Sequence, residues 1–129
     1  MHIRVDDLSG PEIHALLEEH LQDMRRISPP ESVHALDLDA LRRPEITFWT
    51  AWSNDELVGC GALKTHDASH GEIKSMRVSG TRRRTGAGRA MLHHIVHEAQ
   101  RRGIRRLSLE TGSQPEFEPA RQLYSSMGF

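Results

Sequence analysis

A glycine-rich turn ahead of a helix-forming segment constrains the fold of this chain more than any other feature. Residues 71–103 read GEIKSMRVSGTRRRTGAGRAMLHHIVHEAQRRG, with Arg-x-x-Gly-x-Gly at positions 83–88. The first N–H groups of a helix lack partners within it, and the helix dipole adds partial positive charge there. Gly86 and Gly88 would let an anion approach the backbone without an intervening side chain. The turn therefore predicts a phosphate-type site between a strand and a helix.

Hydrophobic periodicity on both sides of this turn predicts alternating strands and helices. Ser9 is expected to cap the first helix, and Gly103 to end the helix that follows the glycine turn. Gly59 and Gly61 inside a strand indicate a bulge or a close backbone approach. The last strand returns after a helix, so a right-handed crossover would make it parallel to its partner. The expected strands cover 2–7, 46–52, 57–65, 72–79 and 105–111, and the expected helices cover about 10–25, 31–43, 86–102 and 119–127.

Length and composition predict one globular domain over residues 1–129. With 36% hydrophobic and 27% charged residues, the chain can form a core and keep a polar surface. No apolar run reaches the roughly 18 residues of a membrane span, and the first residues lack the apolar core of a signal peptide. A single cysteine, Cys60, excludes an internal disulfide and is typical of a reducing compartment. We expect a cytoplasmic protein with no membrane partner.

The formal net charge of −1 hides an asymmetry along the chain. Residues 1–45 hold ten acids against five arginines, whereas residues 77–106 hold nine arginines against one acid, Glu98. A basic block can indicate nucleic-acid binding. This block contains no aromatic residue, surrounds a phosphate-type turn and is balanced by acids elsewhere. A small phosphorylated ligand is the simpler interpretation, and no nucleic-acid partner is expected.

These features occur in the order found in the GNAT N-acetyltransferase superfamily, which the chain resembles over nearly its whole length. The resemblance rests on the strand before the turn, the turn, its helix, the parallel strand and a last helix ending Leu123-Tyr124-x-x-x-Gly128-Phe129. The strand end Leu109-Glu110-Thr111-Gly112 is similar to that of small bacterial members. The resemblance implies an α/β (α+β) GNAT fold with a mixed, mostly antiparallel sheet and helices on both faces.

The family fold continues after this Gly-Phe pair with two more strands, which residues 1–129 do not include. We therefore expect either that the C-terminal end is incomplete or that the strands come from elsewhere, such as a partner chain in a homodimer. An uncovered sheet edge would otherwise remain. The resemblance implies that these two strands wall the acceptor pocket, whereas the implied coenzyme site lies within residues 1–129.

The resemblance implies acetyl-coenzyme A (acetyl-CoA) as co-substrate. The backbone of Met76 and Val78 would pair with the pantetheine arm as if it were another strand. The pyrophosphate would lie on the turn and the start of its helix. For each arginine at 82–84, a solvated position in a basic loop stays open as the alternative. The residues implied to bind the coenzyme at the turn are Arg83, Arg84, Thr85, Gly86, Ala87, Gly88 and Arg89.

Two side chains match the family's acid–base residues. Glu72 matches the carboxylate that acts as general base in some members, although a carboxylate is a poor base for a protonated amine unless it is buried or helped by water. Tyr124 matches the tyrosine that protonates the departing thiolate. The alternatives are a strand-end glutamate paired with an arginine and a helical tyrosine that packs in the core. A backbone N–H near residues 76–78 could polarise the thioester carbonyl.

The resemblance implies acetyl transfer to a primary amine of a small molecule or peptide, with a non-catalytic acyl-CoA binding module as the alternative. The segment at 28–34, which includes Glu31, is expected to line the acceptor site, where its acid would suit a cationic amine. Glu110, a second carboxylate near the same sheet edge, is expected to make a structural hydrogen bond.

Other reactive or aromatic side chains have simpler interpretations. His93 and His97 have the spacing of two metal ligands on one helix face, but the residue after His93 is not glutamate. A solvated helix face is expected instead, and no metal site. Cys60 is expected to be a buried, inert thiol. Phe48, Trp49 and Trp52 are expected to pack in the core.

Overall fold

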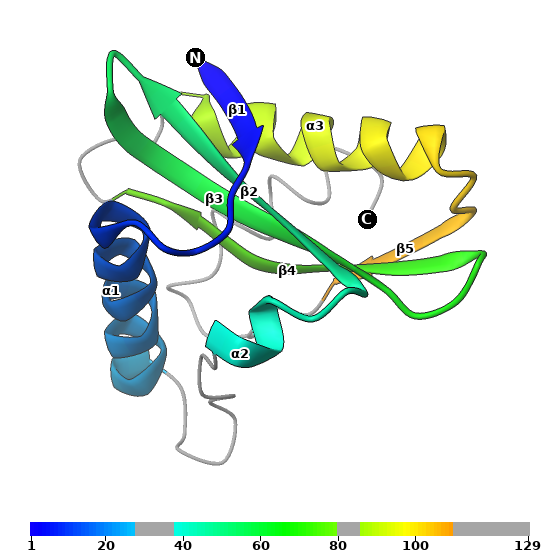
Figure 1. The fold of residues 1–129 in the computed structure, drawn as a ribbon, viewed down its shortest axis with the longest axis horizontal. Helices are drawn as coiled ribbons and strands as arrows, with labels where there is room; N and C mark the ends of the chain where they lie inside the picture. Colours follow the sequence, from blue (N-terminus) through cyan, green and yellow to red (C-terminus); the bar gives the residue numbers. More distant parts are fainter. Residues whose placement is uncertain (28–37, 80–85, 110–129) are drawn as a thin grey trace.

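The computed structural model describes residues 1–27, 38–79 and 86–109 (Figure 1). The predicted order of strands and helices is confirmed over these residues. The last expected helix, and the part of the second one that precedes residue 38, lie outside them. The elements are β1 (His2–Val5), α1 (Pro11–Ile27), α2 (Leu38–Leu41), β2 (Ile46–Ser53), β3 (Glu56–Thr65), β4 (His70–Val78), α3 (Ala87–Arg101) and β5 (Arg106–Leu109).

The five strands form one sheet in the order β1-β2-β3-β4-β5. The first three pairings are antiparallel, and β4 pairs with β5 in parallel through the crossover helix α3. The mixed, mostly antiparallel sheet and the parallel last strand are thus both confirmed. Successive hairpins explain the antiparallel part, and the intervening helix explains the parallel pair.

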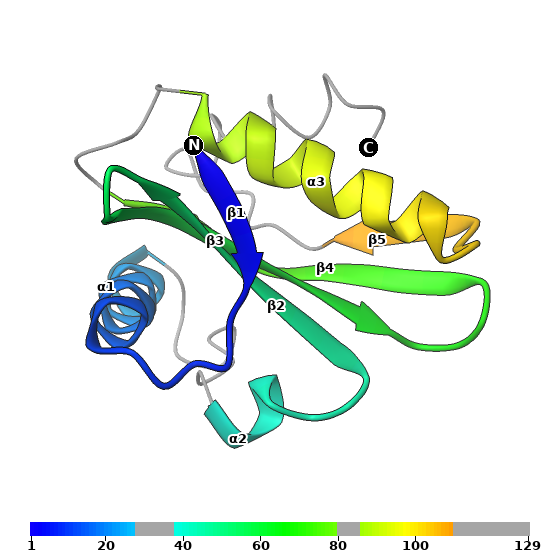
Figure 2. The ribbon, with the colours of Figure 1, turned by 45° about the horizontal axis from the view of Figure 1, so that its top comes forward.

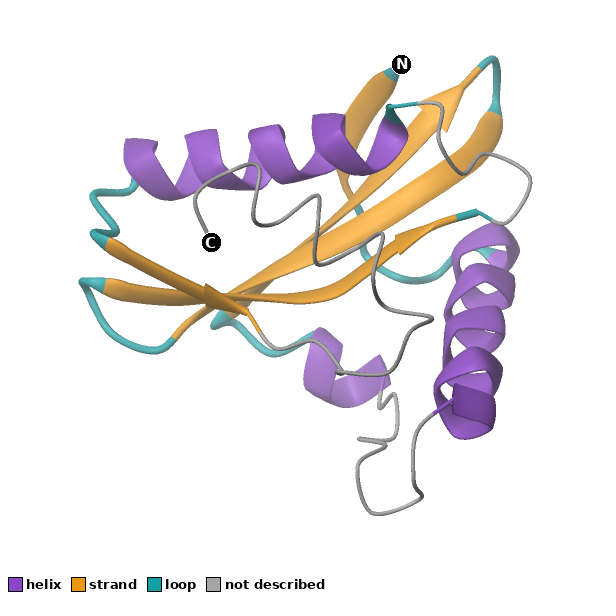
Figure 3. Ribbon diagram, turned by 180° about the vertical axis from the view of Figure 1, so that it is seen from behind, coloured by secondary structure: helices purple, strands orange, loops and turns teal. Residues whose placement is uncertain are grey.

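Helices cover both faces of the sheet, as predicted. Figure 2 shows α3 on one face and α1 and α2 on the other. On the α3 side, Trp49 and Ile73 pack with Leu92 and Ile95 of the helix. On the opposite side, Ile13 and Leu16 of α1 and Leu41 of α2 belong to a second cluster with strand residues, Phe48 among them. Seen from behind, α1 is steeply inclined to α3 (Figure 3).

The buried stripe of α3 follows a row of residues four apart. Ala87, Met91, Ile95 and Ala99 are buried, with Leu92 beside them. The spacing of apolar residues in the sequence places Ala90 on this stripe, but Met91 is the buried residue and Ala90 is only partly buried. The helix ends as predicted, because Gly103 adopts a positive φ of 79° after it. No helix among the described residues is long and apolar enough to cross a membrane.

The start of α1 differs from the prediction that Ser9 caps it. The helix begins at Pro11, and the carbonyl of Gly10 accepts the first helical hydrogen bond, from the His14 N–H. Gly10 therefore occupies the cap position. The Ser9 hydroxyl instead donates to the Asp7 carboxylate at 2.6 Å, and the helix starts one residue later than the sequence pattern suggests.

The expected irregularity at Gly59 and Gly61 is confirmed, and it forms a bulge in β4. Between two regular stretches of the β3–β4 ladder, one β3 residue, Gly61, faces two β4 residues, Ser75 and Met76. Ser75 has a positive φ of 54°. A Cβ at Gly61 would lie 2.9 Å from the Met76 sulfur, and a Cβ at Gly59 would lie 3.0 Å from the Arg77 carbonyl oxygen. Both glycines therefore permit a close approach by β4.

Candidate active site

The turn that was predicted to bind phosphate ends at an uncapped helix N-terminus. Gly86 is the N-cap of α3 with φ 89° and ψ 0°, a left-handed conformation that favours glycine, and no side-chain hydrogen bond caps the helix there. Ala87 is buried in the core cluster and so anchors the first turn. Gly88 is partly exposed and Arg89 is exposed. The helix start thus has the geometry of an anion site.

Several residues predicted from the sequence lie outside the described part of the chain. Gly86, Ala87, Gly88 and Arg89 are described, as are the predicted residues of β4. The residues for which the structure gives no position are Arg82, Arg83, Arg84 and Thr85 of the turn, Tyr124 of the last helix, and Glu31 and Glu110.

Strand β4 leads toward this turn and is paired on both sides along only part of its length. Its residues 70–73 pair with Arg106–Leu109 of β5. From residue 74 to its end at Val78, the described pairing partner is β3 alone. Met76 and Val78 lie in this second stretch and pack partly against the core on the α3 side. Within the described residues, the backbone edge of this stretch has no neighbouring strand, so it could accept an extended ligand.

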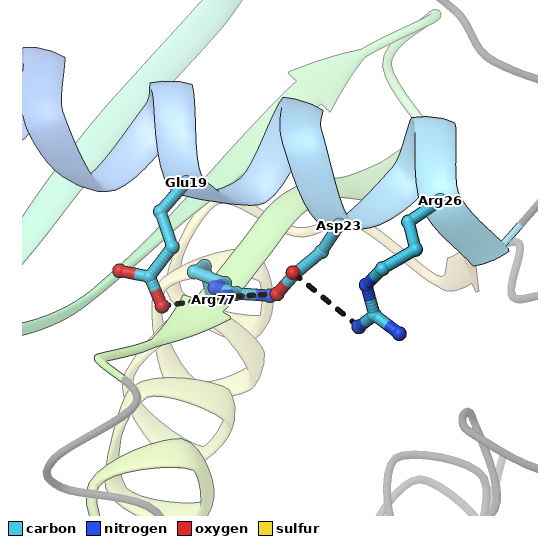
Figure 4. Close-up of polar contacts among 4 residues, drawn as sticks. All are labelled: Glu19, Asp23, Arg26 and Arg77. Atoms are coloured by element: carbon cyan, nitrogen blue, oxygen red, sulfur yellow. Dashed lines mark hydrogen bonds and ion pairs between the residues drawn. The ribbon is translucent and has the colours of Figure 1, made fainter.

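Arg77 ties this stretch of β4 to α1 (Figure 4). Its guanidinium donates to Glu19 at 2.7 Å and also to Asp23, and its side chain is only 9% exposed. Asp23 also lies 3.5 Å from Arg26. Burial is the largest single effect on the Asp23 carboxyl and raises its pKa, but the hydrogen bonds and charges of Arg77 and Arg26 together outweigh burial and lower the pKa. The sequence did not predict this cluster, because Arg77 is more than 50 residues away from Glu19 and Asp23.

His20 lies on α1 between the two acids that bind Arg77. Its Nδ1 is buried and has no hydrogen-bond partner in the described structure. Burial, and then the positive charge of Arg77, lower the pKa of His20 from 6.5 to about 4. The ring is therefore neutral at neutral pH.

Glu72, the predicted base, lies on the paired half of β4 and is held by the side chains of His66 and Lys74. Its Oε1 is 2.8 Å from His66 Nε2, its Oε2 is 3.5 Å from Lys74 Nζ, and its side chain is 17% exposed. The alternative of a pairing with arginine is wrong for the described residues. Burial raises the pKa of Glu72, but the His66 hydrogen bond and the Lys74 charge together lower it below its usual value. Glu72 is thus ionised at neutral pH.

Cys60 supports the bulge and does no chemistry, as predicted. It is fully buried, and its thiol donates to the carbonyl of the bulge residue Ser75, with Sγ 3.3 Å from the oxygen. Burial raises the pKa of Cys60 to about 12, so the nucleophilic thiolate does not form near neutral pH.

His93 and His97 are exposed on α3, which confirms the interpretation as a solvated helix face. His94 between them packs edge-on against the core residue Trp49, with ring centroids 5.3 Å apart. Across residues 1–27, 38–79 and 86–109, no group of three or more His, Cys, Asp or Glu side chains is arranged to hold a metal ion.

A shallow cleft of about 390 Å³ lies between α1 and the β2–β3 turn. Its wall includes four carboxylates, those of Glu12, Glu19, Asp55 and Glu56. A wall of this charge would repel the phosphates of a coenzyme. The helix start at the glycine turn is therefore better suited to an anion than this cleft is.

The chain is similar in sequence and in fold to known acetyltransferases. The sequence model of the Acetyltransferase (GNAT) family matches residues 13–129. An uncharacterized N-acetyltransferase of Bacillus subtilis (strain 168), YsnE, is 60% identical over 129 residues, which is 100% of this chain and 85% of that protein. YedL of Escherichia coli (strain K12), also an uncharacterized N-acetyltransferase, is 48% identical over 98% of this chain and 80% of its own.

Among solved structures, a GNAT family acetyltransferase from Elizabethkingia anophelis with acetyl-CoA bound has a TM-score of 0.75 to this chain. The alignment covers 99% of this chain and 74% of that one, at 22% sequence identity. At this identity the likeness shows a shared fold.

Proposed function

Since the chain belongs to the acetyltransferase (GNAT) family, we propose that it transfers the acetyl group of acetyl-CoA directly to a primary amine. The observation that carries this proposal is the stretch of β4 after the bulge, which leads from an edge without a neighbouring strand among the described residues toward the uncapped start of α3. One end of the site offers backbone to an amide-containing arm, and the other offers N–H groups to phosphate.

Acetyl-CoA would enter this site as substrate. Its pantetheine arm would lie along Met76 and Val78, and its pyrophosphate would lie on the turn from Arg83 to Arg89. The left-handed Gly86 and the absence of a capping side chain fit this role, because a larger residue at the cap would project toward the phosphates. The arginines of the turn would add positive charge.

In the proposed reaction the amine nitrogen attacks the thioester carbonyl carbon and the carbon–sulfur bond breaks. Glu72, ionised in this structure, would receive the proton that the amine loses, directly or through a water. Tyr124 would give its proton to the departing thiolate. An N–H of β4 near Met76 would stabilise the negative charge that develops on the carbonyl oxygen. Much of the rate would come from holding the two substrates together.

The proposed acceptor is an amine of a small molecule or peptide. The acidic N-terminal third of the chain favours a cation, and four carboxylates line the cleft beside α1. A cationic amine must lose a proton before it can attack, which is the step assigned to Glu72.

A panel of primary amines, with free thiol release as the readout, tests the proposed function. Transfer to at least one amine is expected, with Tyr124→Phe and Glu72→Gln each lowering kcat by about 10²-fold or more. His93→Ala, an exposed change on α3, serves as the matched control and should leave turnover unchanged. Acetyl-CoA binding without transfer to any amine would instead support a non-catalytic acyl-CoA binding module. Wild-type turnover in Tyr124→Phe would remove the acid assignment.

A further inference from the structure

A polar chain of four side chains on the face of the sheet opposite α3 joins the β3–β4 turn to strands β4 and β5. Glu72 Oε1 is 2.8 Å from His66 Nε2. The rings of His66 and His70 stack with their centroids 4.8 Å apart. His70 Nε2 is in turn 2.9 Å from the Ser108 hydroxyl of β5. The Glu72 carboxylate is therefore oriented by His66 of the β3–β4 turn, and His66 is supported in turn by His70 and Ser108.

This arrangement restricts Glu72 more than a strand position alone would. A glutamate side chain has three rotatable bonds, and ordering it costs conformational entropy. The His66 ring fixes one carboxylate oxygen, and its own plane is fixed by the stack on His70. The second oxygen, Oε2, makes only the longer contact of 3.5 Å to Lys74. The carboxylate is thus anchored on one side and more loosely held on the other.

Apart from Asp67, the other charged side chains near Glu72 on this face are basic. Lys64 is its cross-strand partner on β3, and Arg106 of β5 is the partner of His70. Asp67, in the turn before His70, uses its carboxylate on the turn backbone and on Ser69. The hydrogen bond from His66 is the closer of two contacts that favour the ionised carboxylate, and the contact with Lys74 is the other.

We propose that His66 is the positioning residue for Glu72: it holds Oε1, so that the more loosely held Oε2, with its longer contact to Lys74, receives the proton of the acceptor amine. This inference rests on the proposed function, in which Glu72 is the base. His66 acts through Glu72 and not on the substrate. The histidine pair and Ser108 connect that contact to β4 and β5.

Removal of His66 should change the pKa of Glu72 in a predictable direction. The hydrogen bond favours the ionised form of Glu72, so its loss raises the pKa of that carboxyl. The acid limb of the kcat/KM profile then moves to higher pH, by about one unit. Loss of orientation lowers kcat above that limb as well, by about 10-fold.

The test compares His66→Ala, His66→Gln and the control His93→Ala in the thiol-release assay across pH. His66→Ala is expected to show both effects. His66→Gln keeps an N–H donor without a titrating ring and should restore most of kcat, while His93→Ala should match the wild type. A wild-type profile for His66→Ala, or no recovery in His66→Gln, would overturn the proposal.

A second measurement separates this inference from the proposed function. The side-chain carboxyl carbon of Glu72, assigned by its absence in Glu72→Gln, is followed by NMR as pH is lowered. It should titrate at higher pH in His66→Ala than in the wild type, whether or not an acceptor has been found. Identical titrations would overturn the role of His66 even in an active enzyme. Failure of every amine with a shifted titration would overturn only the proposed function.

Discussion

Strand β4 differs between its two halves in how the molecule holds it. Residues 70–73 are hydrogen-bonded to β3 on one side and to β5 on the other. Beyond the bulge at Ser75, the described pairing is to β3 alone, and Arg77 ties the strand to α1. The first half holds the Glu72 side chain in place, while the second half leaves its backbone edge available. One strand can thus serve a side-chain role and a backbone role.

The second half depends on contacts that the first half does not need. A strand paired on one side keeps its position only if its side chains hold it. Here these are the Arg77 cluster on the α1 face and Met76 on the α3 face. Variants that remove such contacts should therefore affect the second half of β4 first.

Arg77→Met should cause the largest loss of stability. It leaves Glu19 and Asp23 facing a buried apolar side chain. Because these two acids are 43% and 24% exposed, we expect a loss of about 3 kcal/mol of unfolding free energy, the low end for removal of one partner of a buried ion pair. Denaturant unfolding measures this loss. Arg26→Met, at a side chain that is 67% exposed, is the matched control and should cost less than about 0.5 kcal/mol. A loss below about 1 kcal/mol for Arg77→Met would show that the cluster does not hold β4; Arg77→Lys should lie between the two if it does.

Acidification should weaken the same region through His20. The folded pKa of His20 is depressed to about 4 from 6.5, so its contribution is fully present above pH 6.5 and is lost as pH falls toward 4. The loss amounts to about 3 kcal/mol at its greatest. His20→Gln cannot gain the proton, so its unfolding free energy should fall less than that of the wild type between pH 6.5 and 4. Parallel pH profiles for the two proteins would contradict this interpretation.

The smallest effect is expected at the junction of the two halves. Cys60→Ala removes the donor to the carbonyl of the bulge residue Ser75 and should cost about 1 to 2 kcal/mol of unfolding free energy. Cys60→Ser keeps a donor at this position and should recover part of the loss. Equal stabilities for the alanine and serine variants would mean that the thiol contributes volume and not a hydrogen bond.

Features that follow from local patterns of apolar residues and glycines could be predicted from the sequence. Apolar spacing predicted α3 and the hairpins, and glycines predicted the end of α3 at Gly103 and the irregularity opposite Ser75. Contacts between distant residues left no local pattern, so Arg77 and its acids on α1 were missed. The role of His66 was also missed. His66 and Glu72 are an even number of residues apart across the β3–β4 turn, and this spacing could have placed both on one face of the hairpin. Ser9 was misassigned as a cap because Gly10 and Pro11 shift the helix start by one residue.

The most direct test of the proposed coenzyme site is calorimetric titration of acetyl-CoA into the purified chain, with Gly86→Glu and Gly86→Ala compared. Both substitutions strain the left-handed cap, but only glutamate places negative charge at the proposed phosphate site. We expect roughly micromolar binding by the wild type, retained within about 10-fold by Gly86→Ala and lost in Gly86→Glu. No binding by the folded wild type, or equal binding by the two variants, would contradict the assignment of the phosphates to this turn.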